Sequence, residues 1–254
     1  HGTSALAMLD GDLVIAETLI RRALKLWGRI GSREHVARAG NSLGGALYKA
    51  GRNAEAWDVL EESITLLRGM RQPEMLARSL QNAILVDFAR SDRPSAHLRL
   101  DELMQLGEKL GDDHILARAL ADRCVLAQYA EDWSTATGLA EDSLNRTRRL
   151  GDREGMARGL ANLAYCVQAA GDLSRARDGF IESRDLYRAV GDMRGVAESM
   201  LNLARIGRDR GDEPDALTLG RQSADLFRAC GDHVGEADAE GLLAELNAGQ
   251  ATID

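Results

Sequence analysis

The sequence of 254 residues is poor in aromatic side chains, which make up only 4% of it. This composition is unfavourable for β-sheets, in which aromatic and β-branched residues are enriched. Proline is also rare, and Pro73, Pro94 and Pro214 each lie two or three residues past an expected break, where proline can open a helix. Alanine, leucine and arginine dominate instead. This mixture predicts helices that pack closely through small side chains.

Other absences exclude whole classes of protein. No run of apolar residues approaches the roughly eighteen that a membrane-spanning helix needs, and the start has no signal-peptide pattern. A net charge of −8 argues against direct binding of nucleic acid, whose phosphates require a basic surface. Cys124, Cys166 and Cys230 are odd in number and lie in different segments, which predicts a reduced, cytoplasmic compartment. Arginine outnumbers lysine 29 to 3, which favours a GC-rich bacterial genome.

The sequence repeats itself every forty residues. Glycine recurs at Gly31, Gly111, Gly151, Gly191 and Gly231, and half a period away at Gly11, Gly51, Gly171 and Gly211. Arg71, Ser91 and Glu131 fill the remaining glycine positions. Two alanine columns have no exception: Ala16, Ala56, Ala96, Ala136, Ala176 and Ala216, and Ala37, Ala77, Ala117, Ala157, Ala197 and Ala237.

Gly-Asp pairs such as Gly151-Asp152 mark the breaks between helices of about four turns. Glycine ends a helix because it adopts the left-handed conformation without a Cβ clash. The aspartate that follows can cap the next helix by accepting from its free N–H groups. Seven aspartates occupy this position: Asp12, Asp112, Asp152, Asp172, Asp192, Asp212 and Asp232.

These patterns predict an all-α fold, an α-solenoid of about six helix-turn-helix repeats. We expect twelve substantial helices, the first near residues 12–29 and the last near 233–248. The alanine columns predict close helix contacts, and an apolar seam is predicted at Leu26, Leu66, Leu106, Leu186 and Leu226. We expect residues 1–254 to form a single array. Because residues 3–10 are in phase with the second half of a helix, we also expect a piece of a longer protein.

The stretch "LANLAYCVQAAGDLSRARDGF" from Leu160 to Phe180 resembles the tetratricopeptide repeat family. Residues Leu160, Leu163, Ala164, Gly171, Ala176 and Phe180 fall on the framework of that consensus. The resemblance covers nearly the whole chain and implies a right-handed superhelix, although each unit has six extra residues. The forty-residue variety is similar to Pins/LGN-type polarity scaffolds. It is also similar to the C-terminal arrays of bacterial regulators of the MalT and AfsR kind, where an ATPase module accompanies the repeats.

No strong catalytic pattern is present, so we expect no enzyme, no cofactor and no metal. A phosphate-binding G-x-x-x-x-G-K-[S/T] loop is missing. The glycines of "GNSLGG" at 40–45 lie in a helical stretch, where close packing explains them. His35, His97, His114 and His233 fall in different repeats, and Cys124 occupies a small-residue position that predicts a core cysteine.

A polar ladder recurs on the first helix of each pair, where positions four apart share a face. One column reads Arg38, Arg78, Arg118 and Arg158, followed by Glu198 and Asp238. The next column reads Ser42, Asn82, Asp122, Asn162 and Asn202. A third reads Gly45, Leu85, Val125, Tyr165 and Arg205. We expect this stripe to face the concave groove, with charge running from positive to negative along the array.

This ladder suits the capture of a protein segment. An asparagine amide can pair with both backbone groups of an extended chain, and an arginine fork fits a carboxylate. The segments "ARGLANLA" at 157–164 and "ARSLQNAI" at 77–84 resemble the Asn and Arg ladders of Pins/LGN-type scaffolds. In "ARALADRC" at 117–124, Asp122 replaces the asparagine. The alternative interpretation is a solvated face with hydrogen bonds between repeats, in which Arg118 and Asp122 pair with each other.

Three hypotheses for function follow. The leading one is a non-enzymatic module of a bacterial signalling or transcriptional regulator that binds a protein or peptide segment, with an acidic part of it against the arginines. The second, implied by the MalT resemblance, is a domain that senses a small-molecule inducer in a pocket with aromatic walls. Few aromatic residues fit that groove, chiefly Tyr129 and Tyr165, with Tyr48 and Phe88 as further candidates. The third is self-association through the end repeats.

Overall fold

A computed structural model describes residues 13–250 of the chain. Within these residues the protein is all-α and forms twelve helices, as the sequence predicts. The chain divides into two compact units, unit 1 from His1 to Ala119 and unit 2 from Leu120 to Asp254. None of the described helices is long and apolar enough to cross a membrane. Residues 3–10, Gly11 and Asp12, on which some expectations rest, lie outside the described part of the chain.

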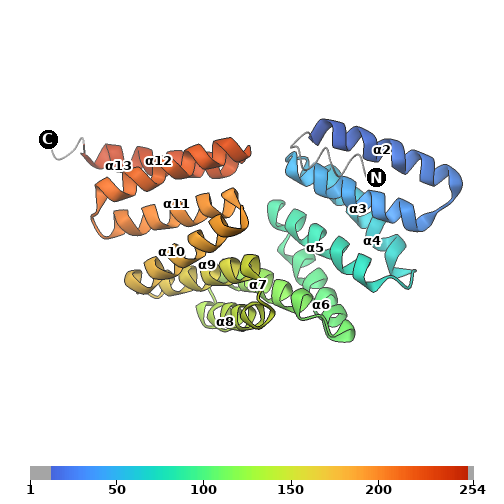
Figure 1. Ribbon diagram of the computed structural model, residues 1–254, viewed down its shortest axis with the longest axis horizontal. Helices are drawn as coiled ribbons and strands as arrows, with labels where there is room; N and C mark the ends of the chain where they lie inside the picture. The colour runs from blue at the N-terminus through green and yellow to red at the C-terminus, as the bar shows by residue number, and fades with distance from the viewer. Residues whose placement is uncertain (1–12, 251–254) are drawn as a thin grey trace. The chain divides into compact units, whose positions relative to one another are not determined.

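Unit 1 is a succession of antiparallel helices joined by short turns (Figure 1). Each helix from α2 to α5 packs against the next one along the chain, and α3 also contacts α5, its equivalent in the next pair. The helices are α2 (Leu13–Ile30), α3 (Arg33–Lys49), α4 (Asn53–Arg68), α5 (Pro73–Ala89), α6 (Arg93–Leu110) and the start of α7 (Asp113–Tyr129).

Unit 2 repeats the same arrangement, and α11 contacts α13 as α3 contacts α5. It contains the rest of α7, α8 (Trp133–Leu150), α9 (Arg153–Ala169), α10 (Leu173–Val190), α11 (Met193–Asp209), α12 (Glu213–Cys230) and α13 (His233–Gln250). The helix ends lie within two residues of the ranges expected for the first and the last helix.

The Gly-Asp pairs act as predicted. Every glycine of the two glycine columns from Gly31 to Gly231 has a positive φ, between 64° and 87°. Asp152 accepts a hydrogen bond from the Gly155 N–H at 3.0 Å. Asp112, Asp172, Asp192 and Asp232 cap their helices in the same way.

The prediction of a cap at Asp212 is wrong, because its side chain makes no capping bond. The third residue of α12 is Asp215, whose carboxylate would lie beside that of Asp212. The capped helices have no acidic side chain at this position; their N3 residues include Ser95, Gly155 and Arg175.

The alanine columns lie where helices meet. The first column, from Ala16 to Ala216, is fully buried, and the second is buried from Ala37 to Ala197. Ala237 is exposed, so the prediction of a close contact is wrong there; no described helix packs beyond α13. A serine column explains the need for small residues, because each hydroxyl donates to an alanine carbonyl of the neighbouring helix. The pairs are Ser63 with Ala37 at 2.7 Å, Ser183 with Ala157 at 2.8 Å and Ser223 with Ala197 at 2.8 Å.

The predicted leucine seam is only half-buried, and Leu26 is 49% exposed. The true interior stripe on these helices runs through the positions of Leu60 and Leu67, which are seven residues apart and fully buried. The predicted seam residue of this helix, Leu66, directly precedes Leu67. One residue corresponds to a rotation of about 100° around the helix axis, so Leu66 points away from the interior. The buried column consists of Ile20, Leu60, Leu100, Ala140, Phe180 and Gly220.

Side-chain volumes compensate between neighbouring helices. A Cβ atom on Gly195 of α11 would lie 2.6 Å from the ring of Tyr187 on α10. Gly235 meets the ring of Phe227 in the same way, one repeat later. In unit 1 the order is reversed, because Gly107 of α6 receives the branched side chain of Ile115 at 3.1 Å. Each of these three crossings therefore combines one large residue with one glycine, which allows close packing of the two helices.

Candidate functional site

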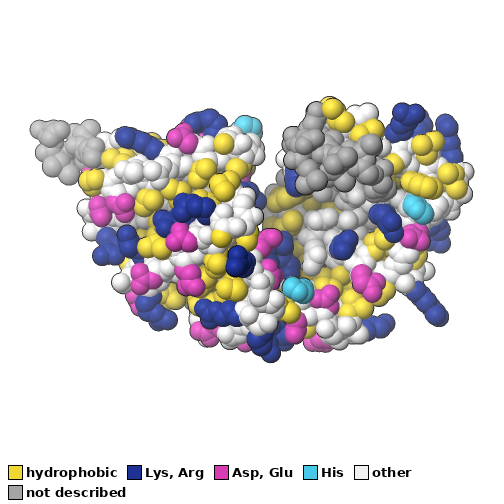
Figure 2. Space-filling view, viewed as in Figure 1, with side chains coloured by type: hydrophobic (Ala, Val, Ile, Leu, Met, Phe, Trp, Pro, Cys, Tyr) yellow, Lys and Arg dark blue, Asp and Glu magenta, His cyan; other side chains and the backbone are white. Residues whose placement is uncertain are grey.

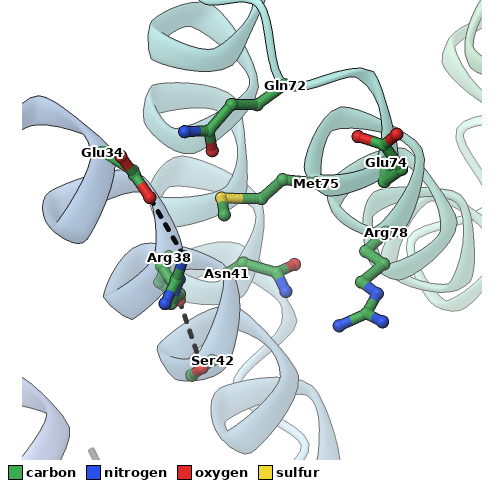
Figure 3. A pocket seen from close by; sticks show the side chains of 8 residues that line it. All are labelled: Glu34, Arg38, Asn41, Ser42, Gln72, Glu74, Met75 and Arg78. Atoms are coloured by element: carbon green, nitrogen blue, oxygen red, sulfur yellow. Dashed lines mark hydrogen bonds and ion pairs between the residues drawn. The ribbon is translucent and has the colours of Figure 1, made fainter.

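Unit 1 contains an open hollow of about 580 Å³ between α3 and α5 (Figure 3). Three ladder residues, Arg38, Ser42 and Arg78, lie on it. Its remaining wall is mostly polar, with one methionine. The full lining is Glu34, Arg38, Asn41, Ser42, Gln72, Glu74, Met75 and Arg78.

The charges of this hollow balance, since two arginines face two glutamates. The Arg38 Nη2 atom donates to the Glu34 carboxylate at 3.1 Å, one turn earlier on α3. Ser42 donates its hydroxyl hydrogen to the Arg38 carbonyl at 3.1 Å. Arg78 is exposed and has no ion-pair or hydrogen-bond partner within residues 13–250. Its guanidinium is therefore the group in the hollow that is available to an incoming carboxylate.

The side chain of Asn82 joins two first helices. Its Nδ2 atom donates to the Asn41 Oδ1 atom at 2.9 Å, which connects α5 to α3. Gly45 lies beside this bond, and a Cβ atom at that position would be 3.8 Å from Asn82 Nδ2, an ordinary van der Waals contact. An amide has two N–H donors and two acceptor positions, so this single bond leaves capacity for a ligand.

Arg118 and Asp122 lie on α7, at the boundary between the two units. Arg118 is half-buried, and Asp122 is only 5% exposed. A carboxylate with so little accessible surface is a poor contact for a bound segment. Their roles in binding remain predictions.

Unit 2 contains a smaller hollow of about 140 Å³. Three predicted site residues, Asn162, Tyr165 and Asn202, line it, together with Glu198 of the ladder. Aromatic rings from α10 close its base. The full lining is Gln128, Ala161, Asn162, Tyr165, Phe180, Tyr187, Glu198, Ser199 and Asn202.

Two other predicted residues of α7 and α9 lie outside this lining. Arg158 is half-buried, and its charge acts on the Tyr187 phenol. Tyr129 is 54% exposed.

The asparagines of unit 2 already make internal hydrogen bonds. Asn162 Nδ2 donates to the Ala121 carbonyl at 3.2 Å, which joins α9 to α7. Asn202 Nδ2 donates to the Glu198 carbonyl at 3.0 Å, and Asn202 Oδ1 accepts from Arg205 at 3.3 Å. The hydrogen bonds expected by the alternative interpretation are therefore present, and a ligand would use the remaining capacity of these amides.

Two ionisable groups that line this hollow, Glu198 and Tyr187, have raised pKa values. The Glu198 side chain is 49% exposed, yet the protein around it desolvates the carboxylate and raises its pKa, against the opposing charge of Arg194 at 3.4 Å. Burial likewise raises the pKa of the Tyr187 phenol, which stays protonated. A half-exposed group with such strong desolvation is typical of a recess between helices.

The acidic end of the ladder is largely paired. Arg205 Nη2 contacts both carboxylate oxygens of Asp238 at 2.7 Å, and Arg194 Nη2 contacts Glu198 at 3.4 Å. Figure 2 shows basic and acidic side chains interspersed over the helices of unit 2 on the face that it presents. Within unit 2, this pairing weakens the electrostatic field that the column of charges alone would predict.

Sequence reasoning did not identify Phe180 and Tyr187 as walls of the hollow. Both belong to the second helix of their pair, where the buried stripe of Leu60 and Leu67 is found in unit 1. Large aromatic residues at these two positions were the available signal. Within residues 13–250, no three His, Cys, Asp or Glu side chains gather in a way that could hold a metal ion.

The comparisons with known proteins bear on the repeat and the fold. A model of the tetratricopeptide repeat family matches residues 155–229, so this part of the chain consists of tetratricopeptide repeats. The fold of the described chain is a tetratricopeptide-like α-solenoid. No curated protein sequence matches the chain significantly.

Solved structures share the fold at low sequence identity. The apo form of RapI is similar with a TM-score of 0.71 and 11% identity, over 97% of this chain and 95% of RapI. BtubC (BKLC) from P. vanneervenii gives 0.65 and 14%, over 87% of this chain and 93% of that one. A signal transduction ATPase with numerous domains and a tetratricopeptide repeat sensor, from Pyrococcus horikoshii, gives 0.58 and 16%, over 93% of this chain and 38% of that one.

Proposed function

We propose that this protein is a non-enzymatic module that binds a protein segment along the exposed faces of its first helices, α3 and α5 in unit 1 and α9 and α11 in unit 2. The observation that carries the proposal is that a hollow in each unit lies on the ladder that the sequence predicts. Arg38, Ser42 and Arg78 line one hollow, and Asn162 and Asn202 line the other.

The hollow of unit 1 suits an extended segment with an acidic side chain. It is open, and its polar walls offer amides from Asn41 and Gln72 to a peptide backbone. Met75 provides a flexible apolar contact. Arg78 provides the guanidinium that has no partner, and an arginine fork binds a carboxylate through two parallel hydrogen bonds.

We further propose that the two units belong to one cytoplasmic array within a bacterial signalling or transcriptional regulator. The forty-residue spacing continues across the boundary between Ala119 and Leu120 without a linker. Fold similarity to RapI, to a Rap protein in complex with competence and sporulation factor, and to the sensor-containing ATPase supports a regulatory role.

The test is a titration of fluorescent peptides, drawn from an acidic library and its charge-neutral counterpart, against the protein at two salt concentrations. We expect Arg78→Glu to weaken binding of the selected acidic peptides by about tenfold or more, which corresponds to roughly 1.4 kcal/mol. The matched control is Arg22→Glu, since Arg22 is an exposed arginine of α2, in the same unit but outside the hollow. Equal binding by the Arg78→Glu variant and the wild type, or equal losses in both variants, would contradict the proposal.

A second candidate function is the sensing of a small molecule, which the aromatic walls of the unit 2 hollow favour. Tyr165, Phe180 and Tyr187 line a recess that also presents Glu198 and three side-chain amides. At about 140 Å³ it is smaller than the 300–1,000 Å³ typical of ligand pockets, so it fits only a compact polar molecule or one side chain. A screen of small metabolites by thermal shift, repeated on Tyr165→Ala, distinguishes this function: a sensor gives a hit that the variant loses.

A further inference from the structure

Two cysteines that are far apart in the sequence meet in the core of unit 2. Cys124 lies on α7 and Cys166 lies on α9, and their side chains are 0% and 1% exposed. Both belong to one buried cluster with Ala136 and Ala140 of α8. Each sulfur lies against the other cysteine closely enough to shift its pKa. Neither is part of a disulfide.

A single amide joins these two sulfurs. Gln128 Nε2 lies 3.4 Å from Cys124 Sγ and 3.4 Å from Cys166 Sγ. The same nitrogen donates to the Asn162 carbonyl at 3.2 Å, which fixes the amide over the pair. The two sulfur atoms are therefore neighbours held against one polar group, whereas most buried cysteines have only apolar surroundings.

The pair also has a route from solvent. Gln128 also lines the hollow of unit 2, so the side chain that contacts both sulfur atoms borders that recess. We expect a small molecule to approach Cys166 from this side.

From this geometry we propose that Cys124 and Cys166 form a dithiol–disulfide pair that a small hydroperoxide oxidises. The Cys166 thiolate attacks the peroxide, breaks the O–O bond and becomes a sulfenic acid, while the peroxide leaves as an alcohol or as water. The Cys124 sulfur then attacks the Cys166 sulfur, and the S–S bond forms as water leaves. Two thiols and one hydroperoxide thus give one disulfide, one alcohol or water molecule, and one water molecule.

The surroundings of the two thiols differ. The neighbouring Cys124 side chain lowers the pKa of the Cys166 thiol, and the Gln128 amide adds to the effect. The neighbouring Cys166 side chain and burial together raise the pKa of the Cys124 thiol. Because the two thiols are coupled, the pair loses one proton at a lower pH and the other at a higher pH. Cys166 is therefore the attacking sulfur, and Cys124 is the resolving one.

The experiment treats the purified full chain with hydrogen peroxide and follows intact mass, free thiols after denaturation, and cross-linked peptides. We expect a loss of the mass of two hydrogens, a fall from three free thiols to one, and a peptide that joins Cys124 to Cys166. The matched control is Cys230→Ser, because Cys230 is the exposed cysteine of α12. That variant should form the same cross-link and retain no free thiol.

Cys124→Ala separates the roles, because Cys166 without its resolving partner should accumulate as a sulfenic acid that dimedone labels. In Cys166→Ala, the remaining core thiol of Cys124 should be oxidised more slowly than the wild-type pair. This variant should therefore give no sulfenic acid that dimedone labels. Persistence of all three thiols in the oxidised wild type would overturn the proposal. So would disulfides that involve only Cys230, or oxidation of Cys166 to a sulfinic acid with no cross-link in the Cys230→Ser protein.

Discussion

Two residues occupy a backbone conformation that suits glycine. Ser91 and Glu131 fill glycine positions of the repeat, and both have φ of 57°. The left-handed region costs a residue with a Cβ atom about 1 kcal/mol or more, whereas glycine enters it freely. The structure keeps the turn because Asp92 and Asp132, which follow, cap the next helices through the Ser95 and Thr135 N–H groups. The repeat geometry therefore overrides the local preference of these two residues.

We predict that Glu131→Gly raises the free energy of unfolding of unit 2 by about 1 kcal/mol, because it removes this strain at an exposed turn. The measurement is urea denaturation followed by circular dichroism. Gly171→Ala, at the equivalent turn after α9 with φ of 87°, is the control and should destabilise the unit by a similar amount. A Glu131→Gly protein with an unchanged or lower midpoint would show that the turn is not strained.

At the scale of the helices, one crossing in unit 1 has charges where all others have apolar side chains. Asp87 of α5 is fully buried and forms an ion pair with Arg99 of α6, which is 6% exposed and also pairs with Glu61 of α4. The equivalents of Asp87 and Arg99 at the other crossings between a first helix and the helix that follows it are uncharged: Leu47, Ala127, Val167 and Gly207, and Val59, Leu139, Gly179 and Leu219.

We predict that Asp87→Ala lowers the free energy of unfolding by about 3–5 kcal/mol, because it leaves Arg99 buried without its closest partner. The double variant Asp87→Leu with Arg99→Val restores the residues of the first repeat and should recover most of that loss. The measurement is a double-mutant cycle by urea denaturation. If the double variant loses as much free energy of unfolding as the two single variants together, this crossing depends on more than the pairing of the two charges.

The pKa of Asp87 predicts how the stability of unit 1 changes with pH. Burial raises its pKa, against the opposing effect of Arg99. The proton-dependent part of its contribution to stability is then complete below the unfolded pKa of about 3.8 and is lost as the pH rises through the raised value. The measurement is urea denaturation of the wild type and of Asp87→Asn at several pH values. The free energy of unfolding of the wild type should fall relative to that of the variant as the pH rises.

At the scale of the whole molecule, each unit buries its helices only against their neighbours, so an end helix protects the one before it. Leu242 and Leu246 of α13 pack on Leu201 and Phe227 in one cluster. Ion pairs fasten the same helix, among them Arg205 with Asp238 and Arg208 with Glu245 at 2.8 Å. The interior faces of α11 and α12 therefore depend on α13.

We predict that deletion of residues 232–254 removes roughly 3–6 kcal/mol of protection from α11 and α12, the value of two buried leucines, and promotes association through the exposed face. Hydrogen exchange should show faster amides in α11 and α12, with α3 and α5 unchanged as the internal control. Sedimentation velocity should show dimers or larger species. A monomeric chain with wild-type exchange would contradict both parts, including self-association through an end repeat.

The sequence by itself determined the helices, their ends and the repeat. These features depend on local chemistry: glycine such as Gly151 stops a helix, Asp152 starts the next, and alanine at a fixed period forces close contact. The same periodicity placed Arg38, Ser42 and Arg78 on one face, and all three line one hollow. These local signals were ambiguous for Asp212 and for the leucine seam. There the neighbouring side chains determined whether the helix is capped and which residues are buried.

Only the tertiary structure decided which side chains meet across helices. Ser183 reaches the Ala157 carbonyl, Tyr187 fills the space that Gly195 leaves, and Cys124 meets Cys166 under Gln128. These contacts depend on the rotation of each helix about its axis and on side-chain volumes summed over three helices. The forty-residue period is the same for every column, so it reveals that positions are equivalent but not which columns face each other.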